Sequence, residues 1–310
     1  MPNFTMGTGF LLMGFSNNWE LQILLAFFFL LIYLVALIGN LLIFILISLD
    51  ENLHSPMYFF LKNLSFLDFC FISTTLPKSI KNSLSHSHSI SFMECVLQLF
   101  LVIFFAASEL FLLTMMSYDR YVAICQPLHY EVIMTRGTCV KMAAVSWFSG
   151  GFFGVLLSTT TSNLPFCSSK EIHQFFCDVP SLLSLSCSDV HIAVDVTLAT
   201  AVALGSLCFI SIAFSYAPIV LTVLKIPTTE DRSKVFSTCV PHLIVLIIFL
   251  TTSFIVYLKP PQKQSDSILD LLLSIFYTVV PPPLNPLIYS LRNKDIKNSL
   301  KKLIAWKCFS

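Results

Sequence analysis

An acid and a base stand side by side near the end of a long, mostly apolar run, as Asp119 and Arg120. A helix in an apolar environment tolerates such charges only close to a membrane surface or against a partner. The pair is therefore a candidate for a switch whose ion pair opens and closes. The alternative interpretation is that the two charges only mark the edge of a membrane, and composition alone gives both interpretations equal weight.

Further polar residues lie inside apolar stretches, namely Asn40, Asp68, Glu109 and Asn285. At about 1.5 Å per helical residue, Glu109 lies roughly 16 Å before Arg120, and Asp68 lies a similar distance beyond the turn at Pro56. Two carboxylates that meet in the middle of a helix bundle need either a proton or a cation. The spacing therefore predicts a buried acidic cluster, either with a cation or as a protonated pair without metal.

The composition indicates that lipid is the solvent of this chain. Of 310 residues 56% are hydrophobic, 30 are Phe and only 11% are charged, whereas charged residues supply about a quarter of a soluble domain. Seven runs are long enough to span about 30 Å of hydrocarbon as helices. They cover residues 23–48, 57–80, 93–122, 140–161, 194–224, 235–258 and 268–291. We therefore predict an all-α membrane protein, a seven-transmembrane helix bundle.

The distribution of Lys and Arg sets the expected orientation. With the N-terminus outside, 13 of the 18 basic residues fall on the cytoplasmic side, which favours this topology. Residues 1–22 are then an extracellular N-terminus, 23–291 the seven-helix membrane domain and 292–310 a cytoplasmic tail. The tail alternates Lys with apolar residues and predicts a short amphipathic helix on membrane lipid, with an ordinary solvated face as the alternative. The net charge of +1 gives no argument for a nucleic-acid partner.

The same topology divides the ten cysteines by compartment. Cys95, Cys167, Cys177 and Cys187 fall outside, where disulfides form, and four cysteines allow three pairings. The sequon at Asn3 also lies outside, where it can be glycosylated.

Several motifs carry a family resemblance. Residues 116–125, MSYDRYVAIC, are followed by PLHY at 127–130. LHSPMYFFL at 53–61, SY at 215–216, KVFSTC at 234–239 and PPLNPLIYSLRN at 282–293 accompany them in order. Together they resemble the odorant receptors, a branch of the rhodopsin-like seven-helix G-protein-coupled receptors, over residues 39–293. One such motif is weak, but five in order are specific.

The resemblance implies roles for individual residues. Asp119 would hold Arg120 at rest, and the released guanidinium would contact Tyr216 and a G protein. The matching positions of this switch are Asp119, Arg120, Tyr121, Tyr216, His242, Asn285, Pro286 and Tyr289. The resemblance also suggests the pairings Cys95 to Cys177 and Cys167 to Cys187, and a sodium ion, as the possible metal, at Asp68 and Glu109. No other cofactor is expected.

Apolar and small side chains at helical spacing predict a ligand site in the outer half of the bundle. They are Val102, Ile103, Ala106, Ala107, Thr200, Leu204, Leu250, Ser253, Phe254, Tyr257 and Thr278. None is charged, which suits a small, volatile, weakly polar molecule. The competing interpretation is plain packing, so about half of these residues are expected to contact ligand.

Other functions fit less well. No phosphate-binding Gly-rich loop, zinc-protease motif or nucleophile elbow occurs in the sequence, so an enzyme is not expected. Matched broken helices of a transporter and charged rings of a channel are not evident. The prediction is an odorant receptor that activates a stimulatory, olfactory-type heterotrimeric G protein and raises cyclic AMP. A rhodopsin-like receptor for a non-volatile lipid or peptide ligand is the alternative. Phe249-Leu-Thr251 departs from the Phe-Tyr-Gly usual in odorant receptors, so the ligand is less certain than the signalling.

Overall fold

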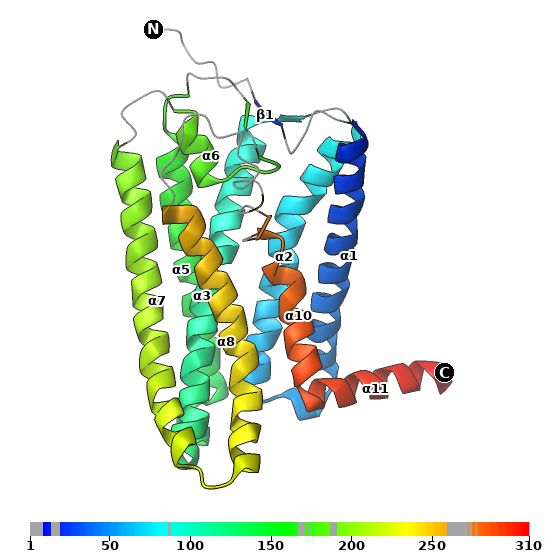
Figure 1. The fold of residues 1–310 in the computed structure, drawn as a ribbon, viewed down its shortest axis with the longest axis vertical. Helices are drawn as coiled ribbons and strands as arrows, with labels where there is room; N and C mark the ends of the chain where they lie inside the picture. The colour runs from blue at the N-terminus through cyan, green and yellow to red at the C-terminus, as the bar shows by residue number, and fades with distance from the viewer. Residues whose placement is uncertain are drawn as a thin grey trace.

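Long helices that run side by side make up most of the chain (Figure 1). The computed structural model describes residues 9–13, 19–85, 88–166, 171–172, 174–186, 191–258, 272, 275–276 and 278–309. The bundle consists of α1 (Trp19–Leu49), α2 (Pro56–Ser85), α3 (Phe92–Cys125), α5 (Arg136–Ser162), α7 (His191–Lys225), α8 (Thr229–Leu258) and the shorter α10 (Pro281–Arg292).

The first six predicted spans are helices in the structure, and each begins and ends within six residues of the predicted limits. Helix α10 forms the C-terminal half of the seventh span, whereas most of the preceding half lies outside the described residues. Within the described part of the chain, α1, α2, α3, α5 and α7 are long and apolar enough to cross a membrane. Helix α8 carries a shorter apolar stretch, Cys239–Ile255.

Large apolar side chains point outward from the bundle. Phe27 of α1 is 63% exposed, Phe148 of α5 is 80% exposed and Phe214 of α7 is 76% exposed. In water this surface would drive aggregation, whereas hydrocarbon solvates it without cost. The molecule is thus an all-α membrane protein, as the composition predicts.

Close contact between α3 and α5 depends on a small residue. A Cβ atom added at Gly150 of α5 would lie 2.0 Å from Oγ of Ser108 and 2.7 Å from the carbonyl oxygen of Phe104, both on α3. Glycine therefore lets the two backbones approach, as small residues do between membrane helices. This approach brings the outer half of α5 next to the predicted ligand site.

A small sheet covers one end of the bundle, which we call the outer end. It joins β1 (Phe10–Leu12), β2 (Ser89–Ile90) and β3 (Glu171–Ile172) in the order β2-β1-β3. Strand β1 is antiparallel to β2 and parallel to β3. Phe10 packs edge-on against Phe166, with ring centroids 5.5 Å apart. The sequence did not predict this sheet, in which part of the N-terminal segment takes part.

The opposite, inner end carries helix α11 (Lys294–Phe309), which lies roughly at a right angle to the long helices and projects sideways from the bundle in Figure 1. Its side chains divide into two faces: Ile296 and Ser299 are buried, whereas Lys297, Lys301 and Lys302 are exposed. The predicted amphipathic C-terminal helix is therefore present. The same end holds the short elements η1 (Glu51–Leu53), η2 (Pro127–His129) and α4 (Tyr130–Ile133).

Hydrogen bonds tie α11 to the turn between α1 and α2 and to the first residues of α2. The Ser299 hydroxyl donates to Asp50, and the Tyr58 hydroxyl donates to Asp295 at 2.9 Å. The Ser299 bond, followed by the backbone N–H of Asn52, lowers the pKa of Asp50 from 3.8 to about 2. These bonds fix α11 against the inner end of the bundle.

Candidate ligand cavity and signalling switch

The outer end of the bundle is closed by the loop that precedes α7, which contains α6 (Val179–Ser184). A disulfide joins Cys95 of α3 to Cys177 of this loop, with Cα atoms 5.5 Å apart. The predicted Cys95–Cys177 pairing is therefore present. Cys167 and Cys187 lie outside the described residues, although the neighbouring Phe166 and Ser186 form an antiparallel bridge.

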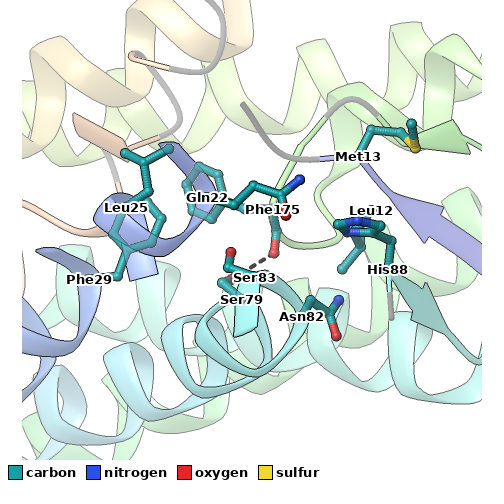
Figure 2. A pocket seen from close by; sticks show the side chains of 10 residues that line it. All are labelled: Leu12, Met13, Gln22, Leu25, Phe29, Ser79, Asn82, Ser83, His88 and Phe175. Atoms are coloured by element: carbon teal, nitrogen blue, oxygen red, sulfur yellow. Dashed lines mark hydrogen bonds between the residues drawn. The ribbon is translucent and has the colours of Figure 1, made fainter. Parts of the chain in front are cut away.

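Two polar side chains fasten the same loop to the bundle. Oε1 of Gln98 accepts the backbone N–H of Cys177 at 2.9 Å, while its Nε2 donates to the Thr74 carbonyl at 3.0 Å. The Ser79 hydroxyl donates to the carbonyl oxygen of Phe175 at 2.7 Å, the dashed line in Figure 2. Within the described part of the loop, the disulfide and the hydrogen bonds of Gln98 and Ser79 thus hold it as a lid over the bundle.

A small hollow lies beside the second anchor. Gln22, Asn82 and His88 give it a partly polar lining (Figure 2). Its volume is about 20 Å³, which is room for about one water molecule. The buried Nδ2 of Asn82 has no hydrogen-bond partner in the part of the chain that the structure describes. This hollow is therefore too small to hold an organic ligand.

A larger cavity of about 120 Å³ lies between α3, α5, α7 and α8. Eight of the eleven predicted ligand residues line it: Ile103, Ala106, Ala107, Thr200, Leu204, Leu250, Ser253 and Phe254. Among the described residues, its lining contains no charged side chain and takes its hydroxyl groups from Thr200 and Ser253. The cavity can therefore hold a small apolar molecule with at most a few hydrogen bonds.

The other three predicted ligand residues differ in their placement. Val102 and Thr278 are buried but do not line this cavity. The side chain of Tyr257 lies outside the described ones. Eight of the eleven predicted ligand residues therefore line the same cavity.

Helix α5 adds two residues to the cavity wall that the sequence reasoning missed, Phe153 and Leu157. They are four residues apart and so lie on one helix face. The available signal was the pair Gly150 and Gly154, because small residues mark the side on which a membrane helix approaches a neighbour. The cavity is further lined by Leu110, Ala201, Val202, Gly205 and Phe249.

The acidic cluster predicted in the middle of the bundle is present. Nδ2 of Asn285 donates to Oδ2 of Asp68 at 2.9 Å and to Oε1 of Glu109 at 3.1 Å. Asp68 is 0% exposed, Glu109 1% and Asn285 3%. The second carboxylate oxygen of Glu109, Oε2, has no hydrogen-bond partner among the described residues. One amide therefore bridges two buried carboxylates and leaves one oxygen unsatisfied.

At the inner end Asp119 accepts hydrogen bonds from two sides. Nε of Arg120 donates to Oδ2 of Asp119 at 3.0 Å, and Nη2 donates to the same oxygen. The Tyr130 hydroxyl of α4 donates to Oδ1 at 2.8 Å. Burial, followed by the charge of Asp119, raises the pKa of Tyr130, so this tyrosine remains a donor. The sequence reasoning missed Tyr130, although it stands in the PLHY motif.

A second hydrogen-bonded chain connects three helices near this ion pair. Nε2 of His242 on α8 lies 2.9 Å from the carbonyl oxygen of Leu113 on α3, and its Nδ1 lies 2.6 Å from the Tyr216 hydroxyl on α7. A carbonyl oxygen only accepts, so Nε2 carries a proton. In the neutral ring Nδ1 then accepts the proton of Tyr216. The Tyr216 hydroxyl thus contacts His242.

The remaining predicted switch residues flank these groups. The hydroxyl of Tyr121 accepts from Nε2 of Gln126 at 3.1 Å. Pro286 of α10 packs against α1 at Gly39, where an added Cβ would lie 3.1 Å from its ring. The side chain of Tyr289 lies outside the described ones.

Comparison with known proteins identifies the family. The sequence profile of the family described as olfactory receptor matches residues 29–307. Olfactory receptor 14A2 from Homo sapiens is 56% identical over 304 residues, which cover 98% of this chain and 96% of that protein. The chain belongs to the olfactory receptor family. Olfactory receptor 14A16 from Homo sapiens is 55% identical over 307 residues, 99% of each chain. Olfactory receptor 1G1 from Gorilla gorilla gorilla is 47% identical over 302 residues, 97% of this chain and 96% of the relative.

Family membership establishes the general function. Olfactory receptors are seven-helix, multi-pass membrane proteins that respond to odorants and act through G proteins, and they are not enzymes. The predicted glycosylation site of this olfactory receptor, Asn3, lies outside the described residues.

Proposed function

We propose that this olfactory receptor binds small, weakly polar, volatile molecules in the cavity between α3, α5, α7 and α8. The observation that carries the proposal is the described part of the lining, which combines apolar side chains with the hydroxyls of Thr200 and Ser253 and has no charged side chain. Such a site selects by shape and by one or two hydrogen bonds. An ionised ligand would enter it without a counter-charge, at a large desolvation cost.

We further propose that the receptor activates a stimulatory, olfactory-type G protein and so raises cyclic AMP. At rest Asp119 holds Arg120, and the Tyr216 hydroxyl is engaged by His242. Activation would release both groups, so that Arg120 contacts Tyr216 and the G protein. The His242 contact supports this sequence of events, because it links α8 to α3 and α7 and must break when α8 moves.

The acidic cluster suits a sodium ion. The unsatisfied Oε2 of Glu109 and the carboxylate of Asp68 are hard oxygen donors close to a common amide, Asn285. Sodium held by Asp68 and Glu109 would neutralise their repulsion and favour the resting bundle. A protonated pair without metal is the alternative. Replacement Glu109→Gln should abolish the sodium dependence of basal signalling, and unchanged sodium dependence would exclude the site.

We propose that the N-terminus is extracellular and the C-terminus cytoplasmic. Asn3 would then be glycosylated, and Cys167 would pair with Cys187 beside the Phe166–Ser186 bridge. The grouping of Lys297, Lys301 and Lys302 on the exposed face of α11 supports this orientation, since the inner leaflet is anionic. Antibody access to tags at either terminus of intact cells tests it, and a C-terminal tag stained from outside would contradict it.

The test of function is a cyclic AMP assay with a panel of volatile molecules. Wild type, Arg120→Ala and the matched control Lys141→Ala, an exposed cation at the same end, are compared at equal surface level. We expect an odorant response in wild type and in the control and none in Arg120→Ala. Silence of the wild type toward all volatiles, followed by a response to lipids or peptides, would favour the alternative ligand class.

A further inference from the structure

The ligand cavity meets the outside of the bundle at the seam between α7 and α8. Two of its lining residues are open to the surroundings: Val202 of α7 is 42% exposed and Phe254 of α8 is 37% exposed. The same side chains therefore border the cavity on one side and the surface of the bundle on the other. At this seam the wall of the cavity is one side chain thick.

The ring of Phe254 closes the seam. A Cβ atom added at Gly205 of α7, which also lines the cavity, would lie 3.2 Å from Cζ of Phe254 and 3.7 Å from its Cε2. The ring thus reaches across from α8 into the space that a side chain at position 205 would take. Gly205 and Val202 are three residues apart and lie on one face of α7. Rotation of this one ring would open the cavity beside them.

The outer side of the cavity is closed more firmly. Ile103 and Leu157 line the cavity and pack in one apolar cluster with residues of the lid, namely Cys177, Val179 and Leu182. These three lid residues are at most 2% exposed, and the disulfide of Cys177 ties them to α3. A ligand that entered past the lid would have to separate this packing, whereas at the seam it has to displace a single ring.

Apolar side chains surround the seam on the surface of the bundle. They are 38% to 59% exposed and comprise Leu198 and Phe209 of α7 and Ile247 and Ile255 of α8. Such a surface lies in hydrocarbon rather than in water. A small apolar molecule concentrates in this hydrocarbon, by about fourfold for each CH₂ group. Most of an apolar ligand is therefore on the lipid side of the seam before it binds.

We propose that odorants enter the cavity from the membrane, through a portal between α7 and α8 formed by Val202, Gly205 and Phe254. Phe254 is the gate of this portal, because its ring must leave Gly205 before a ligand can pass. This route rests on the proposed function, since it leads to the cavity in which odorants are proposed to bind. It adds a selection for molecules that dissolve in lipid.

A thiol placed inside the cavity tests the route. Ala106→Cys puts it on the wall formed by α3, and its modification over time is followed by mass spectrometry of peptides from the full receptor in phospholipid nanodiscs. One probe is methyl methanethiosulfonate, which is small, neutral and soluble in lipid. The other is its trimethylammonium-ethyl analogue, which carries a permanent charge and stays in water.

Two variants change the portal in opposite directions, each in the Ala106→Cys background. Phe254→Ala removes the gate, and its matched control Ile255→Ala shortens the next exposed side chain of α8. Val202→Trp covers the portal, and its matched control Ala203→Trp adds the same ring at the neighbouring exposed position of α7. Thermal unfolding of each protein reports whether the fold is kept.

We expect the neutral reagent to modify the Phe254→Ala variant at least about tenfold faster than the background, a barrier lower by about 1.4 kcal/mol. Val202→Trp should slow the same reaction several-fold, because the indole obstructs the portal. The two controls should keep the rate of the background. The charged reagent should leave the cavity thiol unmodified, since it does not dissolve in the hydrocarbon that surrounds the portal.

Release of the lid by Cys95→Ser with Cys177→Ser tests the competing outer route. Faster modification in this variant, with unchanged rates in Phe254→Ala and Val202→Trp, would overturn the proposal. Equal acceleration by Phe254→Ala and Ile255→Ala would show a general loosening of α8 and overturn it as well. Because the readout contains no odorant, its failure is distinct from failure of the proposed receptor function.

Discussion

The ligand cavity and the acidic cluster share helix α3 but differ in how they are built. Ala106 and Ala107 face a space whose lining carries no charge, whereas Glu109, two or three residues later, meets Asp68 and Asn285 on another side of the helix. The side chains around the cavity are mostly apolar, whereas those of the acidic cluster are held together by hydrogen bonds. The difference teaches that the same helix can provide a site that tolerates changes of side chain and a site that does not.

The lid covers the ligand cavity, and a disulfide holds it in place. Removing this disulfide should give the largest change in the free energy of unfolding. The double replacement Cys95→Ser with Cys177→Ser releases a loop of 82 residues in the unfolded chain. We expect the free energy of unfolding to fall by about 4 kcal/mol, measured by thermal unfolding in detergent. Cys70→Ala, at a half-buried free thiol, should cost less than about 1 kcal/mol. Equal losses would show that the disulfide adds no special constraint.

The acidic cluster should respond strongly to loss of its bridging amide. Asn285→Leu removes the donor that Asp68 and Glu109 share, and we expect unfolding to become easier by about 3 kcal/mol. Ser253→Ala in the cavity removes a hydroxyl that makes no hydrogen bond to another described residue, so its cost should stay below about 1 kcal/mol. Comparable costs in the two variants would remove the contrast between the regions.

Replacements in the cavity should instead change the sensitivity of the receptor to odorant. Ala106→Leu places three additional carbon atoms in about 120 Å³, and we expect at least a tenfold rise in the concentration of odorant that gives half-maximal cyclic AMP, on the order of 1.4 kcal/mol. Ala203→Leu adds the same atoms at an exposed position of α7 and serves as the control. If both variants, at equal surface level, kept wild-type sensitivity, the odorant would bind elsewhere.

The smallest expected change is in the stability of the α11 contacts at the inner end as the pH is lowered. Its contacts lower the pKa of Asp50 from 3.8 to about 2. A carboxyl group with a lowered pKa in the folded state contributes stability above pH 3.8, which is lost as the pH falls toward 2. Hydrogen exchange of the α11 amides, corrected for the intrinsic rate, should show constant protection between about pH 5 and 8 and a decrease below pH 3.8.

The variant Asp50→Asn separates this group from other acids. It should show weaker protection at neutral pH and no further step between pH 3.8 and 2. A step of unchanged size in the variant would assign the transition to a carboxylate other than Asp50.

Periodicity and hydrophobicity predicted the helices because lipid leaves the backbone no partner outside its own helix. The polar residues that apolar surroundings normally reject, Asp68, Glu109 and Asn285, were visible in the sequence for the same reason. The sheet that contains β1 was not predictable in this way. Its strands have two or three residues and come from segments far apart in the chain, so no local pattern marks them.

By itself the sequence determined the class of protein, the first six helices, the acidic cluster and eight of the fifteen described residues that line the cavity. Tertiary structure alone decided that Phe153 and Leu157 of α5 join the cavity wall, that Tyr130 holds Asp119 and that His242 receives Tyr216. The physical reason is that lipid, as the solvent, acts on each residue separately. Its effect therefore appears directly in the hydrophobicity of the sequence. Side-chain contacts between helices depend on how closely two backbones approach and how they are rotated, and only the packed bundle sets both.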